Sequence, residues 1–366
     1  MTTVVLAVSG HGYGHAVRSA QVAGELLKRG ARVLLRSEAP IWLFPQGVQP
    51  IDSPGWPIDV GVVQHHGLEF DIDATRDCWR RVGHDFDARA SVEAELLRSV
   101  RADVLIADVP PLAIVAAHLA GIPSVAVTNF TWDWIYAAWP GFEDIVQQIR
   151  SAYAQADLLL RLPLHGTDAD AFSAFKRVED VPLIARTASK PKSAVRAELG
   201  VPTAAKLILL SFGGFPARDI NLDALAEAGG YTFLLTLPLS RDAHTTAANV
   251  VVLREQPADY VSVLAACDAL VTKPGYGIVA DCLANRVPML YTDRGPFREY
   301  DVLVDALHRL GCARYVPRAD VLDGRLASHL DALRDSTCTW SELRLDGAST
   351  VAQHVLNLKK QACAVT

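Results

Sequence analysis

Three glycine-containing loops carry the residue types that could do chemistry in this chain. The first, at residues 9–15, contains two histidines among its glycines and is followed by Arg18. An imidazole can act as a general base or hydrogen-bond a substrate hydroxyl, so His15 is our first catalytic candidate. Arg18 can hold a carboxylate or phosphate, or cover a solvated helix face. His11, Gly12 and Gly14 would line a binding loop, because glycines let a backbone approach a ligand closely.

Two further loops lie in the second half of the chain. Residues 211–214 read Ser-Phe-Gly-Gly, and residues 272–277 read Thr-Lys-Pro-Gly-Tyr-Gly just before an expected helix at 278–284. The free N–H groups at a helix start attract phosphate oxygens. Asp281, one turn into that helix, can accept hydrogen bonds from ribose hydroxyls. A plain glycine turn at 211–214 and ordinary helix capping by Asp281 are the competing interpretations.

The first loop does not match the common nucleotide motifs. No Gly-Lys-Ser/Thr follows its glycines, and no acidic residue closes the second strand as a dinucleotide fingerprint requires, Glu38 being the nearest. Asp-x-Asp triplets begin at Asp71, Asp85 and Asp168, but such triplets arise by chance in an acidic chain. We therefore expect no cofactor and no bound metal.

The loops need elements to position them, and the apolar pattern predicts an α/β fold. Buried runs without polar alternation, separated by amphipathic stretches, are typical of parallel sheets with right-handed helical crossovers. In the first half we expect strands at 3–8, 31–35, 104–107 and 124–127 and helices at 16–28 and 112–120. In the second half we expect strands at 206–211, 232–237, 250–253, 269–272 and 288–291 and helices at 222–228, 260–266 and 278–284.

A length of 366 residues predicts about two domains. A proline- and lysine-rich stretch at 181–201 is the expected join. We expect Rossmann-like parallel-sheet domains at 1–185 and 186–345. The amphipathic stretch at 351–358 predicts a C-terminal helix within 346–366 that packs back across the join.

Composition and charge limit the possible partners and cellular location of the protein. A net charge of -6 without a basic block argues against nucleic acid as a partner. The six cysteines form no Cys-x-x-Cys pair and several lie in apolar stretches, so we expect reduced, buried thiols. No signal peptide or apolar run of membrane-spanning length is evident. We expect a cytoplasmic protein with at most peripheral membrane contact.

These motifs resemble those of GT-B glycosyltransferases, in the family that includes the peptidoglycan N-acetylglucosaminyltransferase MurG. Residues 9–18 are similar to that family's Gly-Gly-His loop, with Gly14 and His15 in register. Residues 273–288 are similar to its donor-binding helix, with Asp281 in place of a ribose-binding glutamate. A closer resemblance, to the glycosyltransferase-like N-terminal half of plant-type L-arabinokinases, rests on residues 59–64, 129–136, 180–183 and 195–200. No Gly-rich kinase segment follows, so we do not expect kinase activity.

The resemblance implies a cleft between the two domains, with a nucleotide-sugar donor on the second domain and a hydroxyl acceptor on the first. The implied donor-binding residues, from base and diphosphate to ribose and sugar, are Gln256, Pro257, Ser211, Gly213, Gly214, Lys273, Gly275, Tyr276, Gly277, Asp281 and Glu299. Pro274 removes one backbone donor from the phosphate loop. The acceptor-binding candidates are His11, Gly12, Gly14, Arg18, His65, Asn129, Trp132 and Asp133. Each has a structural alternative, such as a core position for Trp132.

The expected activity is glycosyl transfer from a UDP-linked or related nucleotide sugar, independent of metal and with inversion. His15 would be the base and Asp108, at the end of an apolar strand, the second catalytic candidate, although Asp108 could instead cap a helix. Two alternatives stay open from the sequence. One is a non-catalytic nucleotide-sugar-binding module, and the other is a nucleotide-sugar epimerase or hydrolase.

Overall fold

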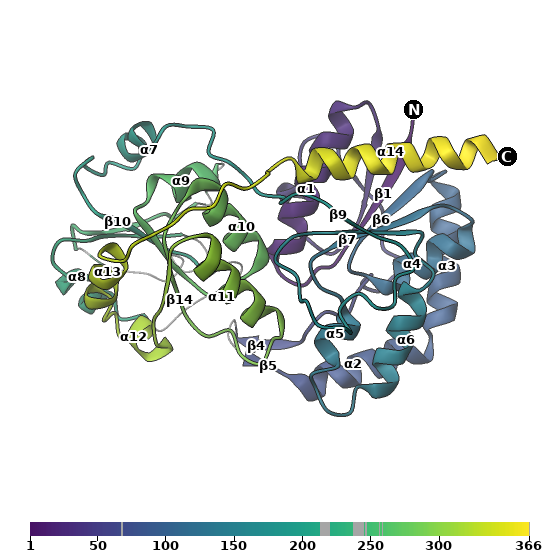
Figure 1. The fold of residues 1–366 in the computed structure, drawn as a ribbon, viewed down its shortest axis with the longest axis horizontal. Coiled ribbons are helices and arrows are strands. Elements are labelled where there is room, and N and C mark those ends of the chain that lie inside the picture. Colours follow the sequence, from purple (N-terminus) through teal and green to yellow (C-terminus); the bar gives the residue numbers. More distant parts are fainter. Residues whose placement is uncertain are drawn as a thin grey trace. The chain divides into compact units, whose positions relative to one another are not determined.

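The chain folds into two compact units, each built on a parallel β-sheet (Figure 1). The computed structural model describes residues 1–66, 69–212, 220–236, 245, 247–255, 257 and 259–365, and gives no account of the side chains at 65, 66, 69 and 360–365. Unit 1 comprises Met1–Val63, Asp71–Ala185 and Arg344–Thr366, and unit 2 comprises Gln64–Phe70 and Arg186–Leu343. The expected α/β class with two parallel sheets is confirmed.

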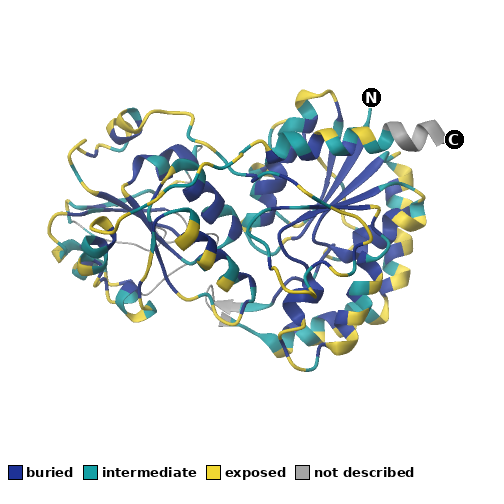
Figure 2. Ribbon diagram, viewed as in Figure 1, coloured by how far each residue is buried: buried dark blue, intermediate teal, exposed yellow. Residues whose placement is uncertain are grey.

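Unit 1 contains a seven-stranded sheet in the order β3-β2-β1-β6-β7-β8-β9, with every neighbouring pair parallel. The strands are β1 (Thr3–Val8), β2 (Arg32–Arg36), β3 (Gln49–Pro50), β6 (Val104–Asp108), β7 (Ser124–Thr128), β8 (Leu158–Arg161) and β9 (Val178–Asp180). Every residue of β1, β6 and β7 is buried, as the continuous apolar runs predict. Figure 2 shows the same contrast between buried strands and helices that expose one side.

The helices of unit 1 follow the alternation of a doubly wound fold. They are α1 (Tyr13–Lys28), η1 (Ile41–Leu43), α2 (Ile72–His84), α3 (Phe86–Ser99), α4 (Pro111–Ala120), α5 (Trp132–Tyr136), α6 (Glu143–Tyr153) and α14 (Gly347–Val365). Helix α1 begins at Tyr13, earlier than the expected residue 16, because Gly12 adopts a φ of 75° and turns the chain at once after β1. His15 therefore lies in the first helical turn and not in a loop.

The C-terminal helix α14 lies within the expected 346–366, extends beyond the amphipathic stretch 351–358, and belongs to unit 1. It packs against α1 and β6. Val351, Ala352 and Val355 are all 0% exposed, which gives this helix a firmly buried face.

Unit 2 contains a six-stranded parallel sheet in the order β12-β11-β10-β13-β14-β15 and a separate antiparallel pair, β4-β5. The strands are β4 (Gln64–His66), β5 (Glu69–Phe70), β10 (Leu207–Leu210), β11 (Thr232–Leu235), β12 (Val250–Val252), β13 (Ala269–Thr272), β14 (Met289–Tyr291) and β15 (Ala313–Tyr315). The helices are α7 (Lys192–Glu198), α8 (Leu222–Glu227), α9 (Tyr260–Ala266), α10 (Tyr276–Asn285), α11 (Glu299–Leu310), α12 (Arg318–Leu322) and α13 (Ala327–Arg334).

One cysteine prediction is wrong. Cys312 and Cys338 form a disulfide with a Cα–Cα distance of 5.0 Å, whereas Cys78, Cys267 and Cys282 are free. The chain after α13 returns beside the end of α11, where Ser341 N donates to Leu310 O at 3.1 Å. That return brings the two half-cystines into bonding range. Sequence spacing alone does not reveal it.

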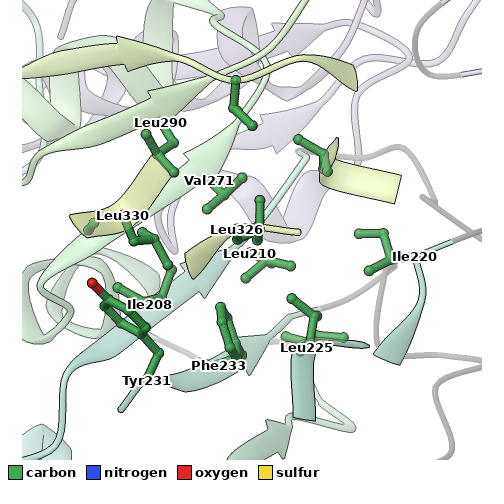
Figure 3. Packing of buried hydrophobic residues seen from close by; sticks show 14 of the residues in the cluster. Ile208, Leu210, Ile220, Leu225, Tyr231, Phe233, Val271, Leu290, Leu326 and Leu330 are labelled. Atoms are coloured by element: carbon green, nitrogen blue, oxygen red, sulfur yellow. The ribbon is translucent and has the colours of Figure 1, made fainter. Parts of the chain in front are cut away.

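The core of unit 2 gathers side chains from four neighbouring strands and from the segments that cover one face of the sheet (Figure 3). Leu210 of β10, Phe233 of β11, Val271 of β13 and Leu290 of β14 meet there, each 0% exposed. Leu225, Leu326 and Leu330 close the cluster from α8 and from the α13 region. This packing holds the ends of β10 and β13 in place, and those ends lead into the second and third glycine loops.

We predict that Leu210→Ala destabilises the protein by about 2–5 kcal/mol, because it removes a fully buried side chain and leaves a cavity. Leu119→Ala, the same change at a residue that is 44% exposed on α4, should alter stability by no more than about 0.5 kcal/mol. Chemical denaturation of both variants measures the difference. Equal stabilities would contradict the packing described here.

Candidate functional site

The first glycine loop leads into a buried polar cluster at the carboxyl edge of the unit 1 sheet. Asp108 is the last residue of β6, His15 and Arg18 lie on the first turns of α1, and Asn129 directly follows β7. The exposed fractions are 5% for His15, 3% for Arg18 and 1% for both Asp108 and Asn129. Parallel strands end at one edge, and the helix after β1 begins there, so this cluster follows from the topology.

The Asp108 carboxylate is the centre of this cluster. Its Oδ1 lies 2.9 Å from His15 Nδ1 and also accepts from Arg18 Nη2. Its Oδ2 accepts from Arg18 Nε at 2.7 Å and from Ser19 Oγ at 2.8 Å. Three side chains of α1 thus converge on one carboxylate at the end of β6.

The electrostatics keep Asp108 ionised. Burial alone raises the pKa of a carboxyl group, but the charge of Arg18, followed by that of His15 and the hydrogen bonds from both, holds the pKa of Asp108 well below its usual range. An ionised carboxylate only accepts hydrogen bonds, so His15 Nδ1 must donate to it. In the neutral ring, the proton on Nδ1 leaves Nε2 as the basic nitrogen.

The backbone next to this carboxylate is strained. Val109, immediately after Asp108, has a φ of 83°, which is a rare conformation for a β-branched residue. Tyr153 Oη donates to the Val109 carbonyl at 2.8 Å and helps to hold it. Strain of this kind is common at functional sites, where the surrounding structure over-determines the backbone.

A second buried carboxylate, Asp59, adjoins the site and was missed as a site residue by sequence reasoning. It accepts from Trp132 Nε1 at 2.7 Å and from the Val60 amide at 2.9 Å. Burial raises the pKa of Asp59, and hydrogen bonds from Ser9 and Trp132 and the charge of His15 oppose that rise. Its segment was notable only as part of the family resemblance.

The loop after Asp59 packs against the first glycine loop. Val62 N donates to His11 Nδ1 at 3.3 Å. Gly61 has a φ of 62°, and a Cβ there would lie 2.8 Å from His11 Cβ. His11 is partly buried, with its ring 5.5 Å from that of Trp132 in an edge-to-face contact. Gly12 and Gly14 follow His11 at the start of α1 and are also partly buried.

Trp132 and Asp133, two expected acceptor-binding residues, lie in the interior. Trp132 is 0% exposed and stacks on Tyr136 at a centroid distance of 5.2 Å. Asp133 is 1% exposed and accepts from Arg150 Nε at 3.2 Å. Of the two interpretations of Trp132, the core position is the one observed. The side chain of His65 lies outside the described residues.

In unit 2, three hydrogen-bonded polar side chains lie at or near the carboxyl ends of β10 and β11. Ser211, after β10, is 6% exposed, and its Oγ accepts from Tyr260 Oη at 2.9 Å and from Thr236 Oγ1 at 3.3 Å. Thr236 directly follows β11, and Tyr260 begins α9. Gly213, Gly214 and Gln256 lie outside the described residues, and Pro257 is partly buried.

The third glycine loop ends at the start of α10 with its backbone accessible. Gly275 is the residue before the helix, has no side-chain cap, and a Cβ there would meet no atom within 4 Å. Tyr276 is 4% exposed and Gly277 is partly buried in the first turn. Burial, with a smaller contribution from the charge of Arg294, lowers the pKa of Lys273 to about 7. An anion beside Lys273 would favour its charged form.

Asp281 is bound by an arginine that the sequence did not single out. Its Oδ1 accepts from the Arg186 amide at 2.8 Å, and its Oδ2 accepts from Arg186 Nε at 3.0 Å and Nη2 at 2.6 Å. Asp281 is 1% exposed. Asn285, one turn on, donates to the Arg186 carbonyl at 2.9 Å. In this structure Asp281 thus anchors Arg186, the residue at which the chain enters unit 2 after Ala185, in addition to any role toward a ribose.

Glu299 is also paired with an arginine. At the start of α11 it is 2% exposed and accepts from Arg294 Nη1 at 2.6 Å. The same Nη1 donates to the Pro274 carbonyl at 3.2 Å, which ties Glu299 to the third glycine loop. Arg186 and Arg294 carried no recognisable signal, because a lone arginine in a loop is usually a solvated residue.

No helix in the described part of the chain has both the length and the apolar character needed to cross a membrane.

The sequence comparisons give one informative relative. No protein-family model matches the chain. An L-arabinokinase of Arabidopsis thaliana is 33% identical over 348 residues, which cover 88% of this chain. The chain spans only 31% of that relative's length, so the similarity concerns a part of a longer protein.

Solved structures similar to this chain include several glycosyltransferases. The glycotransferase of kitacinnamycin is 18% identical with a TM-score of 0.60, covering 99% of this chain and 95% of that one. SnogD from Streptomyces nogalater is 17% identical with a TM-score of 0.58, covering 98% and 100%. Arabidopsis thaliana UGT89C1, complexed with UDP, is 18% identical with a TM-score of 0.57, covering 97% and 94%. The chain has the GT-B fold of these proteins, as expected from its motifs.

Proposed function

We propose that this chain is a glycosyltransferase that moves a sugar from a nucleoside-diphosphate sugar to a hydroxyl acceptor. The observation that carries the proposal is the buried His15–Asp108 pair, with a nitrogen–oxygen distance of 2.9 Å. The GT-B fold adds support, since the similar structures are glycosyltransferases and one was solved with UDP. A fold by itself does not fix chemistry, so the residues of the site must carry the mechanism.

In the proposed mechanism His15 is the general base. Nδ1 donates to Asp108, so Nε2 takes the proton from the acceptor hydroxyl as its oxygen attacks the anomeric carbon of the donor. The bond from that carbon to the nucleoside diphosphate breaks, and the diphosphate leaves with the electron pair. The negative carboxylate of Asp108 stabilises the imidazolium that forms.

The proposed donor side is the carboxyl edge of the unit 2 sheet. The uncapped start of α10 offers backbone N–H groups to the diphosphate, and Lys273 adds a positive charge when protonated. Both would stabilise the charge that develops on the leaving diphosphate. UDP as the nucleotide, independence from metal, an inverting outcome, membership of the MurG-like subgroup and a cytoplasmic location all stay predictions.

A non-catalytic nucleotide-sugar-binding module is the second candidate. The similarity to 31% of a longer kinase favours it, because a segment of a larger enzyme can serve in binding alone. Such a module would bind a nucleotide sugar and show no turnover. An epimerase or hydrolase would instead consume the donor without an acceptor.

A thermal-shift screen of nucleoside diphosphates and nucleotide sugars tests the donor site. A ligand present at 100 times its Kd should stabilise the protein by about 2.7 kcal/mol. Transfer to a panel of hydroxyl acceptors then separates an enzyme from a binding module. If no compound in the screen stabilises the protein, the donor site is wrong.

We predict that His15→Ala lowers the transfer rate by about 100- to 10,000-fold, because it removes the proposed base, while donor affinity stays unchanged. His118→Ala is the matched control, since His118 is exposed on α4. Initial rates and donor titrations measure both effects. Full transfer by His15→Ala would rule out its assignment as the base.

We predict that donor affinity falls as pH rises through about 7, the pKa of Lys273. A bound pyrophosphate favours the protonated lysine, so binding takes up a proton and affinity is greatest at lower pH. The decline can reach about tenfold per pH unit until the raised pKa of the complex is passed. Calorimetry with an intact nucleotide sugar is the suitable measurement, because its pyrophosphate diester keeps a constant charge over this range.

The Lys273→Met variant should bind the nucleotide sugar more weakly and without this pH dependence. Lys192→Met is the control, because Lys192 lies on α7 and pairs with Asp268 at 2.6 Å. An unchanged pH dependence in Lys273→Met would show that another group takes up the proton.

A further inference from the structure

All three side-chain nitrogens of Arg18 donate hydrogen bonds within the unit 1 site. Its Nε and Nη2 donate to the two oxygens of Asp108, and its Nη1 donates to Asn129 Oδ1 at 2.6 Å. Nη2 also lies 3.2 Å from Thr128 Oγ1. The residue is 3% exposed. Its guanidinium therefore faces protein atoms at the ends of β6 and β7, which does not suit the expected role of binding an acceptor anion.

Through these contacts Arg18 connects α1 with the ends of two strands. It begins on α1, holds Asp108 at the end of β6, and reaches Asn129 just beyond β7. A planar guanidinium can donate to two groups at a fixed angle, which a lysine ammonium on a flexible stem cannot reproduce. The orientation of Asp108 relative to α1 is thereby set by Arg18.

The same contacts bear on His15. Arg18 Nη2 and His15 Nδ1 both approach Asp108 Oδ1 and lie 3.0 Å apart. Because Nη2 can only donate, a hydrogen bond between these two nitrogens requires the proton on Nε2, whereas an ionised Asp108 accepts from an Nδ1–H group. The Nδ1–H group of His15 has a hydrogen-bond acceptor only while Asp108 Oδ1 is negatively charged and points toward it. Without Arg18, burial would be the dominant influence on Asp108 and would favour its neutral form. A neutral Asp108 can donate a proton to the ring and reverse the hydrogen bond.

We propose that Arg18 is a positioning residue that holds Asp108 as a charged acceptor and so fixes His15 in the tautomer with Nε2 as the base. The proposal rests on the proposed function for its kinetic consequence, but not for the tautomer itself. Arg18 touches no reacting atom and acts through Asp108. Asp59, whose pKa burial raises, is a further titratable group near His15, and the proposal leaves it unchanged.

The first test is the tautomer of His15, measured by NMR of protein with ¹⁵N-labelled histidine rings and assigned by loss of the signal in His15→Gln. We expect wild-type protein to carry the proton on Nδ1. Arg18→Met should populate the Nε2–H form or mix the two, and Arg18→Lys should restore the wild-type tautomer in part. An unchanged tautomer in Arg18→Met overturns the proposal, whether or not the protein proves to be a transferase.

The second test is kinetic. Arg18→Met should lower kcat by about 10- to 100-fold, the usual effect of losing a group that orients a reactive side chain, and leave KM nearly unchanged. The acid limb of the pH profile should move to higher pH, because Asp108 would protonate more readily. Wild-type kcat and an unshifted profile in Arg18→Met would overturn the proposal.

A double-mutant cycle guards against misfolding, since removing one partner of a buried pair can unfold a protein. If Arg18 acts only through Asp108, Arg18→Met added to Asp108→Asn should change kcat no further. An additional loss as large as that in the wild-type background would overturn the proposal.

Arg36 provides a matched control within unit 1. It ends β2, is 3% exposed, and pairs with the buried Glu93 at 2.8 Å. Arg36→Met should leave the His15 tautomer and the pH profile unchanged. If it altered them as Arg18→Met does, the effect would be general loosening of unit 1, and the proposal would fall.

Discussion

The buried carboxylate of Asp108 is the interaction on which the unit 1 site depends. A carboxylate that is 1% exposed persists in charged form only if donors satisfy both oxygens. All three donors come from α1, namely His15, Arg18 and Ser19. The requirement therefore fixes how α1 is rotated against β6, and it orients the His15 ring in the same step. The packing of α1 and the orientation of His15, the proposed base, are thus set by the same carboxylate.

Unit 2 satisfies its buried carboxylates Asp281 and Glu299 with one arginine each. Asp281 is neutralised by Arg186 and Glu299 by Arg294, so neither presents an unpaired negative charge. The uncapped start of α10 and Lys273, whose pKa burial lowers to about 7, belong to the proposed donor side. Because Arg186 donates to both oxygens of Asp281, a ribose that contacts Asp281 must share the carboxylate with Arg186 or displace it. In the proposed donor site, ribose recognition would thereby be linked to Arg186, where the chain enters unit 2 after Ala185.

The comparisons and the site support different parts of the conclusion. Solved glycosyltransferases at 17–18% identity show the GT-B fold, with TM-scores of 0.57–0.60. The L-arabinokinase is more similar in sequence, at 33% identity. The matched region is 88% of this chain but only 31% of the L-arabinokinase. Neither assigns a reaction, since one fold hosts many chemistries. The proposed reaction depends on the arrangement around His15 and on its acceptor Asp108.

The sequence by itself determined the α/β class, the three glycine loops and the candidates His15 and Asp108, because apolar periodicity and strand-end glycines are local signals. It did not determine partners that lie far apart along the chain. Only the tertiary structure paired Cys312 with Cys338 and placed Trp132 in the core. It also showed that Arg18, a candidate anion ligand, donates to both oxygens of Asp108. Such outcomes depend on which side chains are buried together when the chain packs. No local sequence pattern encodes those long-range partners.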